Sequence, residues 1–212
     1  MIKEEEKGVS MESKVKIERK NLLETLHEMA NDGAECISQL QTAFMYNSGR
    51  PLSGMREKAE AYVNEAGHLS IMLKEAAQQD QSLEPYVPVP EHLQAVWKQI
   101  ARLTERVERK VLDRVLFSDR AVDETMFLLQ RLTEILRPTA EMILARNRFL
   151  SRYIEESQAS IEKSADEYAT LHENRLSSGE CVPAASPLYI AILDSIKSIA
   201  WHTKDIATTL GK

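Results

Sequence analysis

The sequence has few of the residues that interrupt helices or build sheets. Among its 212 residues there are only seven glycines and seven prolines, and aromatic residues make up 6% of the chain. Hydrophobic residues at 43% and charged residues at 28% are typical of a folded chain rich in helix formers. The low aromatic content disfavours a β-sandwich. We therefore expect an all-α fold.

Cysteine, long apolar runs and positive charge are also scarce. Cys36 and Cys181 lie far apart with no CxxC spacing and no signal peptide before them, which favours reduced thiols in a cytoplasmic protein. The longest apolar run, from Leu188 to Leu193, falls well short of the ~20 residues that a spanning helix needs. A formal charge of −6 gives no overall attraction to nucleic acid. We expect a soluble protein that meets membranes only through partners.

Apolar residues recur at three- and four-residue steps in six segments, as in amphipathic helices. The segments run from Leu22 to Phe44, Met55 to Ala76, Leu93 to Val115, Val122 to Ile143, Leu150 to Tyr168 and Ile192 to Leu210. The stretch with Pro85, Pro88 and Pro90 is predicted to be a linker without secondary structure. Pro138 is predicted to bend the fourth helix. Six helices with short polar connections favour antiparallel bundles.

The ends of the later helices carry recognisable signals. Ser118 and Asp119 are good N-caps for the fourth helix, and Gly179 follows the fifth. Ser186 and Pro187 are expected to open the sixth. Long helix, long helix, proline-bearing loop and long helix then occur twice. We predict a charged N-terminal arm (1–20) and two tandem antiparallel three-helix bundles, 21–118 and 119–212.

The two predicted repeats carry short corresponding motifs. The middle helices contain Glu60-Ala-Tyr-Val-Asn64 and Glu162-Lys-Ser-Ala-Asp166, each with polar residues at i and i+4. The third helices contain Glu105-Arg-Val-Glu-Arg109 and Lys197-Ser-Ile-Ala-Trp201. Together with two three-helix repeats of this length, these motifs resemble the PhoU family over roughly residues 21–210.

The resemblance to PhoU implies a function without catalysis. That family couples a phosphate ABC transporter to a sensor histidine kinase and restrains phosphate uptake and the phosphate-starvation response. We therefore expect a cytoplasmic regulatory adaptor that binds a transporter ATPase, a sensor kinase or both, and that forms a homodimer.

In the PhoU family the acidic pairs of these motifs bind metal clusters on the bundle surface. The resemblance thus implies Glu60, Asn64, Glu105, Glu162 and Asp166 as ligands for iron or zinc, and a surface metal-binding bundle is the alternative function. Here Arg109, Lys197 and Trp201 stand where the family has acids. Because these residues remove ligands and add positive charge, we expect no metal cofactor.

Positive charge is predicted to take the place of the metal. We expect Arg109 to face Glu60 or Glu105, and Lys197 to face Glu162 or Asp166, across neighbouring helices. On a helical wheel all these positions fall away from the apolar stripes, so they belong to outward surfaces. Ordinary solvated positions with i,i+4 pairs explain the same pattern equally well.

Trp201 and a basic stripe are the candidate partner-binding residues. A tryptophan on a polar face is typical of binding hot spots, although burial against the neighbouring bundle or a dimer mate explains it equally well. Arg102, Arg106 and Arg109, with Lys110, form a basic stripe that suits an acidic partner, or else a solvated face mixed with glutamates.

Catalytic signatures are missing from the sequence. The five histidines show no paired ligand spacing, and no Gly-x-Ser-x-Gly, phosphate-binding glycine loop or set of Cys, His and acid on neighbouring segments is evident. A helical enzyme that acts on a small anion through Arg and Lys in a groove between the bundles is a third, weaker hypothesis. The sequence favours binding over catalysis.

Overall fold

The computed structural model describes the backbone of residues 2–212 and the side chains of residues 19–212. Its long helices are α1 (Ile2–Tyr46), α2 (Met55–Gln79), α3 (Val89–Leu112), α4 (Asp119–Ala145), α5 (Arg148–Ser177) and α6 (Ser186–Leu210). Three short 3₁₀ helices join them: η1 (Arg50–Leu52), η2 (Gln81–Tyr86) and η3 (Pro183–Ala185). The described backbone contains no strand, so the predicted all-α fold is confirmed.

Helix ends follow the local chemistry of the sequence. Ser118 caps α4, because its Oγ accepts a hydrogen bond from the backbone N–H of Ala121. Arg146 ends α4 in the left-handed region at φ 47°, and Gly179, at φ 78°, follows α5. Pro187 lies in the first turn of α6, where a backbone N–H would have no partner within the helix. The predicted Ser118 cap is confirmed, and the predicted start of α6 is confirmed to within a residue, whereas α4 begins before the predicted apolar stripe at Val122.

The proline-rich stretch differs from the prediction. It was expected to be a linker without secondary structure, but it contains η2, and α3 already begins at Val89. The carboxylate of Asp80 caps η2 by accepting from the N–H and the hydroxyl of Ser82. Pro90 sits in the first turn of α3, where proline is tolerated. Pro138 lies inside an α4 that is continuous from Asp119 to Ala145.

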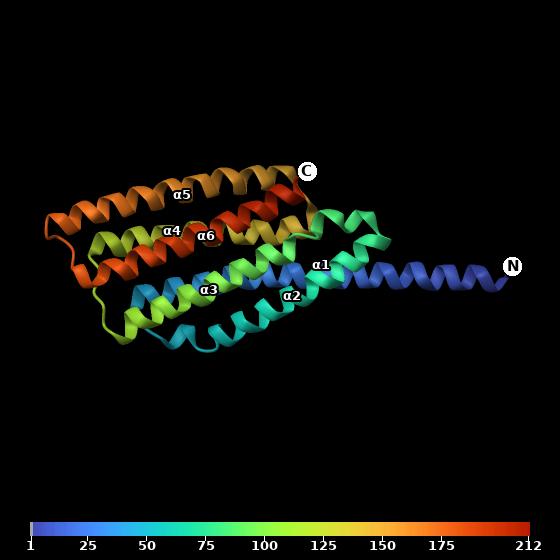
Figure 1. Cartoon of the computed structure of the whole chain (residues 1–212), viewed down its shortest axis with the longest axis horizontal. Coiled ribbons are helices and arrows are strands. Elements are labelled where there is room, and N and C mark those ends of the chain that lie inside the picture. The colour runs from blue at the N-terminus through green and yellow to red at the C-terminus, as the bar shows by residue number, and fades with distance from the viewer. Residues whose placement is uncertain (1) are drawn as a thin grey trace.

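Helices that follow one another in the chain run in opposite directions along one long axis, so α1 and α3 run the same way, as do α4 and α6 (Figure 1). The first half of the chain comprises α1 to α3 and the second half α4 to α6. Within these halves, α2 packs on α3 and α5 packs on α6. Between the halves, α1 packs on α4 and α3 on α6, so α1, α3, α4 and α6 lie inside while α2 and α5 flank them. Buried side chains from all six helices, among them Trp97, Leu128 and Ile196, form one continuous hydrophobic core. The two halves are therefore stabilised by each other.

The predicted N-terminal arm is continuous with α1. The first turns of α1 extend beyond the other helices in Figure 1. The side chains of residues 1–18, which make up most of this arm, lie outside the described residues. No helix in the described part of the chain is both long and apolar enough to cross a membrane.

Candidate functional site

Most of the predicted motif residues lie on the surface, as the helical wheel indicated. The exposed ones are Glu60, Asn64, Arg102, Glu105, Arg109, Glu162, Asp166 and Trp201, while Arg106 and Lys197 are half-buried. Among the described residues, no group of three or more His, Cys, Asp and Glu side chains is arranged to hold a metal ion.

Lys197 joins α6 to α5 through an ion pair. Its Nζ lies 2.9 Å from Oδ1 of Asp166 and 3.6 Å from Oδ1 of Asp194. The hydrogen bond to Asp166 is the main cause that raises the pKa of Lys197. This contact is one of the two that the sequence predicted. A cation thus lies on the carboxylate that the PhoU resemblance implied as a metal ligand.

Arg109 does not make the contact predicted for it. Its Nε lies 3.5 Å from Oδ2 of Asp113, four residues along the same helix. The prediction of Glu60 or Glu105 as partner was wrong. Glu105 and Asp113 both lie one helical turn from Arg109, so sequence spacing did not distinguish between these two carboxylates. Glu60 and Asn64 instead line a shallow groove between α2 and α3 together with Arg102.

The predicted basic stripe on α3 is divided between surface and interior. The guanidinium of Arg106 donates to Ser195 Oγ of α6, and burial lowers the pKa of Arg106. Lys110 is buried, donates to Asn47 Oδ1 at 2.8 Å and lies 4.8 Å from the centre of the Phe44 ring. Because α3 packs against α1, α2 and α6, little of its circumference faces solvent. Only Arg102 and Arg109 remain exposed.

Trp201 is 46% exposed, and the rest of its side chain packs against its own protein. Its ring lies 4.8 Å from the His202 ring and 6.1 Å from the His92 ring, and Lys204 Nζ lies 5.3 Å from its centre. The Nδ1 atoms of His92 (α3) and His202 (α6) are 3.2 Å apart. Burial lowers the pKa of both histidines. We call Trp201, His92, His202 and Lys204 the Trp201 surface.

The sequence analysis did not find this histidine pair. Its members are 110 residues apart in the chain, so no motif spacing brings them together. They meet because α6 packs along α3. The search for paired histidines within single motifs could not have revealed them.

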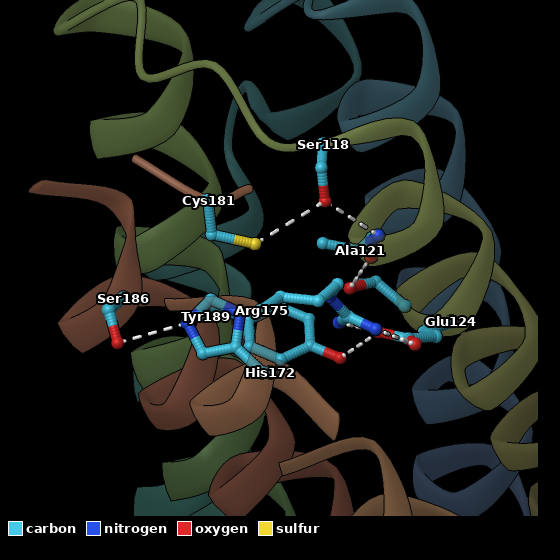
Figure 2. A network of polar contacts seen from close by, with 9 residues as sticks. Ser118, Ala121, Glu124, His172, Arg175, Cys181, Ser186 and Tyr189 are labelled. Atoms are coloured by element: carbon cyan, nitrogen blue, oxygen red, sulfur yellow. Dashed lines mark hydrogen bonds and ion pairs between the residues drawn. The ribbon is translucent and has the colours of Figure 1, made fainter. Parts of the chain in front are cut away.

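A second polar cluster, also missed, lies where α4, α5 and α6 meet near Cys181 (Figure 2). Arg175 of α5 donates two hydrogen bonds to the Glu124 carboxylate of α4, at 2.9 and 2.8 Å. The hydroxyl of Tyr189, from α6, donates to the same carboxylate. We call Glu124, Arg175 and Tyr189 the Glu124 cluster.

Beside the Glu124 cluster lie a histidine and a cysteine. His172 Nε2 is 3.0 Å from Ser186 Oγ, and the His172 ring lies 4.6 Å from that of Tyr189. Cys181 Sγ is 3.9 Å from Ser118 Oγ. A signal for this region existed in the sequence. His172 and Arg175 continue the apolar stripe of Ile161, Ala165 and Tyr168 at helical spacing, so polar side chains occupy buried positions.

The chain matches no protein-family model and no curated protein.

Proposed function

We propose that this protein is a non-enzymatic regulatory adaptor of the PhoU type, which acts in phosphate uptake and phosphate-starvation signalling by binding protein partners. The Trp201 surface is the observation that carries this proposal. The repeated order of six helices, with α2 on α3 and α5 on α6, is consistent with it. The partners are a phosphate-transporter ATPase, a sensor histidine kinase or both, and the protein works as a homodimer.

The Trp201 surface has the chemistry of a binding hot spot. A large part of the indole is exposed, and the rest of it packs near the rings of His202 and His92 and the ammonium group of Lys204. A side chain that is already held in place loses little rotamer freedom when a partner covers it. Tryptophan is among the residues most enriched at such positions.

The mechanism requires differential binding and no chemical step. An adaptor transmits a signal when its partner's conformations bind it with different affinity. Trp201 lies one turn after Lys197 on α6, and Lys197 is paired with Asp166 of α5, so an aromatic group lies beside fixed charges. We propose that this stretch of α6, extended by Arg102 on the neighbouring α3, contacts the partner.

A crosslinking pull-down from native membranes tests the adaptor function. The tagged protein, its Trp201→Ala variant and a Tyr153→Ala control are compared under phosphate excess and starvation, with bound proteins identified by mass spectrometry. Tyr153 is 41% exposed and belongs to α5, so it matches Trp201 as an exposed aromatic residue on another helix. We expect the wild type and the Tyr153 variant to retain a transporter ATPase or sensor kinase, and the Trp201 variant to lose it.

Failure of the wild type to capture either partner under both conditions would reject the adaptor function. Metal analysis of protein purified from medium supplemented with iron and zinc addresses the alternative. We expect no stoichiometric metal, because Lys197 places positive charge on Asp166 and ligands must offset the metal's loss of water. Stoichiometric iron or zinc that disappears in a Glu60→Gln/Glu162→Gln variant would favour the metal-binding bundle.

A further inference from the structure

The two cysteines of the chain occupy opposite environments. Cys36 is buried in α1, where burial raises the pKa of its thiol to about 11. Cys181 is half-buried in the loop that follows α5. It lines a small cavity together with Ser118, His172 and Tyr189. A partly exposed thiol bordered by polar groups is the environment in which cysteines react, whereas a thiol inside an apolar core is inert.

His172 borders the same cavity and has an unused nitrogen. The residue is only 2% exposed, and its Nδ1 has no hydrogen-bond partner among the described residues. Its Nε2 is occupied by Ser186. In Figure 2 the ring nitrogen turned away from Ser186 lies on the side of Arg175 and Cys181. A buried nitrogen left unpaired at a cavity wall points to a reacting or binding group in that cavity.

His172 is held in the neutral form that a base requires. Burial lowers its pKa, and the Arg175 charge on the same helix lowers it further, while Glu124 of α4 and Glu173 of α5 act in the opposite direction. The Tyr189 ring of α6 lies against the His172 ring, and Cys181 of the loop lines the same cavity. When Nε2–H donates to Ser186 Oγ, Nδ1 keeps its lone pair and can accept a proton.

Arg175 supplies positive charge near the sulfur. Its pKa is raised mainly by the hydrogen bond to Glu124 and also by an interaction with the Cys181 side chain. The Nε of Arg175 is buried and has no hydrogen-bond partner among the described residues. An arginine beside a cysteine favours the thiolate, which is the nucleophilic form.

We propose that Cys181 is a thiol-modification site for hydrogen peroxide, in which His172 accepts the thiol proton and Arg175 stabilises the thiolate. This site is independent of the adaptor function. The sulfur attacks one peroxide oxygen, so that the S–O bond forms as the O–O bond breaks. The leaving hydroxide takes the proton from Nδ1 of His172 and departs as water. The sulfur loses two electrons to the peroxide, and the product is the sulfenic acid of Cys181.

Site-resolved labelling of the full chain tests the proposal. The protein is treated with hydrogen peroxide and dimedone, which traps sulfenic acids, and each cysteine is quantified in its own peptide by mass spectrometry. We expect Cys181 to react about tenfold faster at pH 7 in the folded protein than in the chain unfolded in urea. Cys36 is expected to react more slowly when folded than when unfolded. A Cys181 rate equal to that of the unfolded chain overturns the proposal.

Two further measurements separate a base from a merely structural histidine. The pH dependence of the Cys181 rate should differ between the folded protein and the chain unfolded in urea, because His172 accepts the thiol proton only while it is neutral. A His172→Gln variant should lose about tenfold in rate at pH 7, whereas His68→Gln, which changes an exposed histidine on α2, should not. Circular dichroism verifies that both variants fold. If His172→Gln unfolds, the wild-type pH profile decides alone, and a folded-state profile identical to that of the unfolded chain rejects the role of His172.

Discussion

Each half of the molecule contains a carboxylate on its first helix that binds one cation and one phenol. In the first half, Asp32 of α1 lies 2.6 Å from Lys58 Nζ and accepts a hydrogen bond of 2.8 Å from the Tyr62 hydroxyl. We call these three residues the Asp32 cluster. In the second half, the Glu124 cluster repeats this chemistry with arginine in place of lysine.

The two clusters differ in depth and in the helices they join. The Asp32 and Lys58 side chains are 20% and 39% exposed, against 11% for Glu124 and 9% for Arg175. Lys58 and Tyr62 both come from α2, whereas Arg175 and Tyr189 come from α5 and α6. The Glu124 cluster therefore links three helices, and its charged groups are largely shielded from solvent. We therefore expect the Asp32 cluster to contribute little to the free energy of unfolding and the Glu124 cluster to contribute strongly.

The largest predicted effect is the loss of the buried carboxylate charge. Glu124→Gln leaves the Arg175 cation buried and uncompensated, so we expect the free energy of unfolding to fall by about 3–5 kcal/mol. Asp32→Asn, the matched change in the Asp32 cluster, should cost about 1 kcal/mol, because solvent screens Lys58. Urea unfolding followed by circular dichroism measures both. Equal losses in the two variants would remove the distinction between the clusters.

The phenols provide a second comparison of the same kind. Tyr189 is fully buried and donates to a charged acceptor, so Tyr189→Phe should lower the free energy of unfolding by about 1.5–3 kcal/mol. Tyr62→Phe should cost about 1 kcal/mol, because the Tyr62 side chain is only half-buried. A double-mutant cycle of Tyr189→Phe with Glu124→Gln measures their coupling. Additive losses in that cycle would contradict the proposed cluster.

The surroundings of the two clusters should also differ in their response to pH, because His172 lies beside the Glu124 cluster. Burial and Arg175 lower the folded-state pKa of His172, so the unfolded chain binds more protons once the pH falls below about 6.5. Stability is therefore lost as the pH drops through that value, by at most about 1.4 kcal/mol per pH unit for one histidine. His92 and His202, whose pKa values are also lowered by burial, add losses of the same sign.

Unfolding measured between pH 7.5 and 5.5 tests this prediction. His172→Gln should reduce the slope of stability against pH, while Asp32→Asn should leave it unchanged, because this change removes no histidine. A slope that is unaltered in His172→Gln would show that this histidine is not held neutral.

The smallest effect is expected at the Lys197–Asp166 pair. The Asp166 side chain is exposed, so Lys197→Ala should change the free energy of unfolding by less than about 1 kcal/mol, and by still less at high salt. Thermal unfolding at low and high salt measures the difference. A larger loss would mean that the ion pair is shielded from solvent, as the Glu124 cluster is.

The fold was more predictable from the sequence than the candidate site. The six helices follow from apolar periodicity, and the Ser118 cap follows from a preference of its own residue type, because both depend on residues within a few positions of each other. The stretch before α3 was predicted incorrectly, since prolines occupy the first turn of a helix as readily as they interrupt one.

The site residues depended on which helix faces lie against each other. An outward wheel position correctly indicated exposure for Glu60 and Asp166, but the partner of Arg109 and the burial of Lys110 were not predictable. Periodicity gives the angle of a residue around its own helix. It does not say which neighbouring helix covers that angle.

The sequence by itself determined the helices, their approximate ends and the outward positions of most motif residues, because these properties are set within single helices. Only the tertiary structure decided that α1 packs on α4 and α3 on α6, and so brought His92 to His202 and Glu124 to Arg175 and Tyr189. These contacts join residues far apart in the chain, and they form because burial of apolar surface draws the helix faces together.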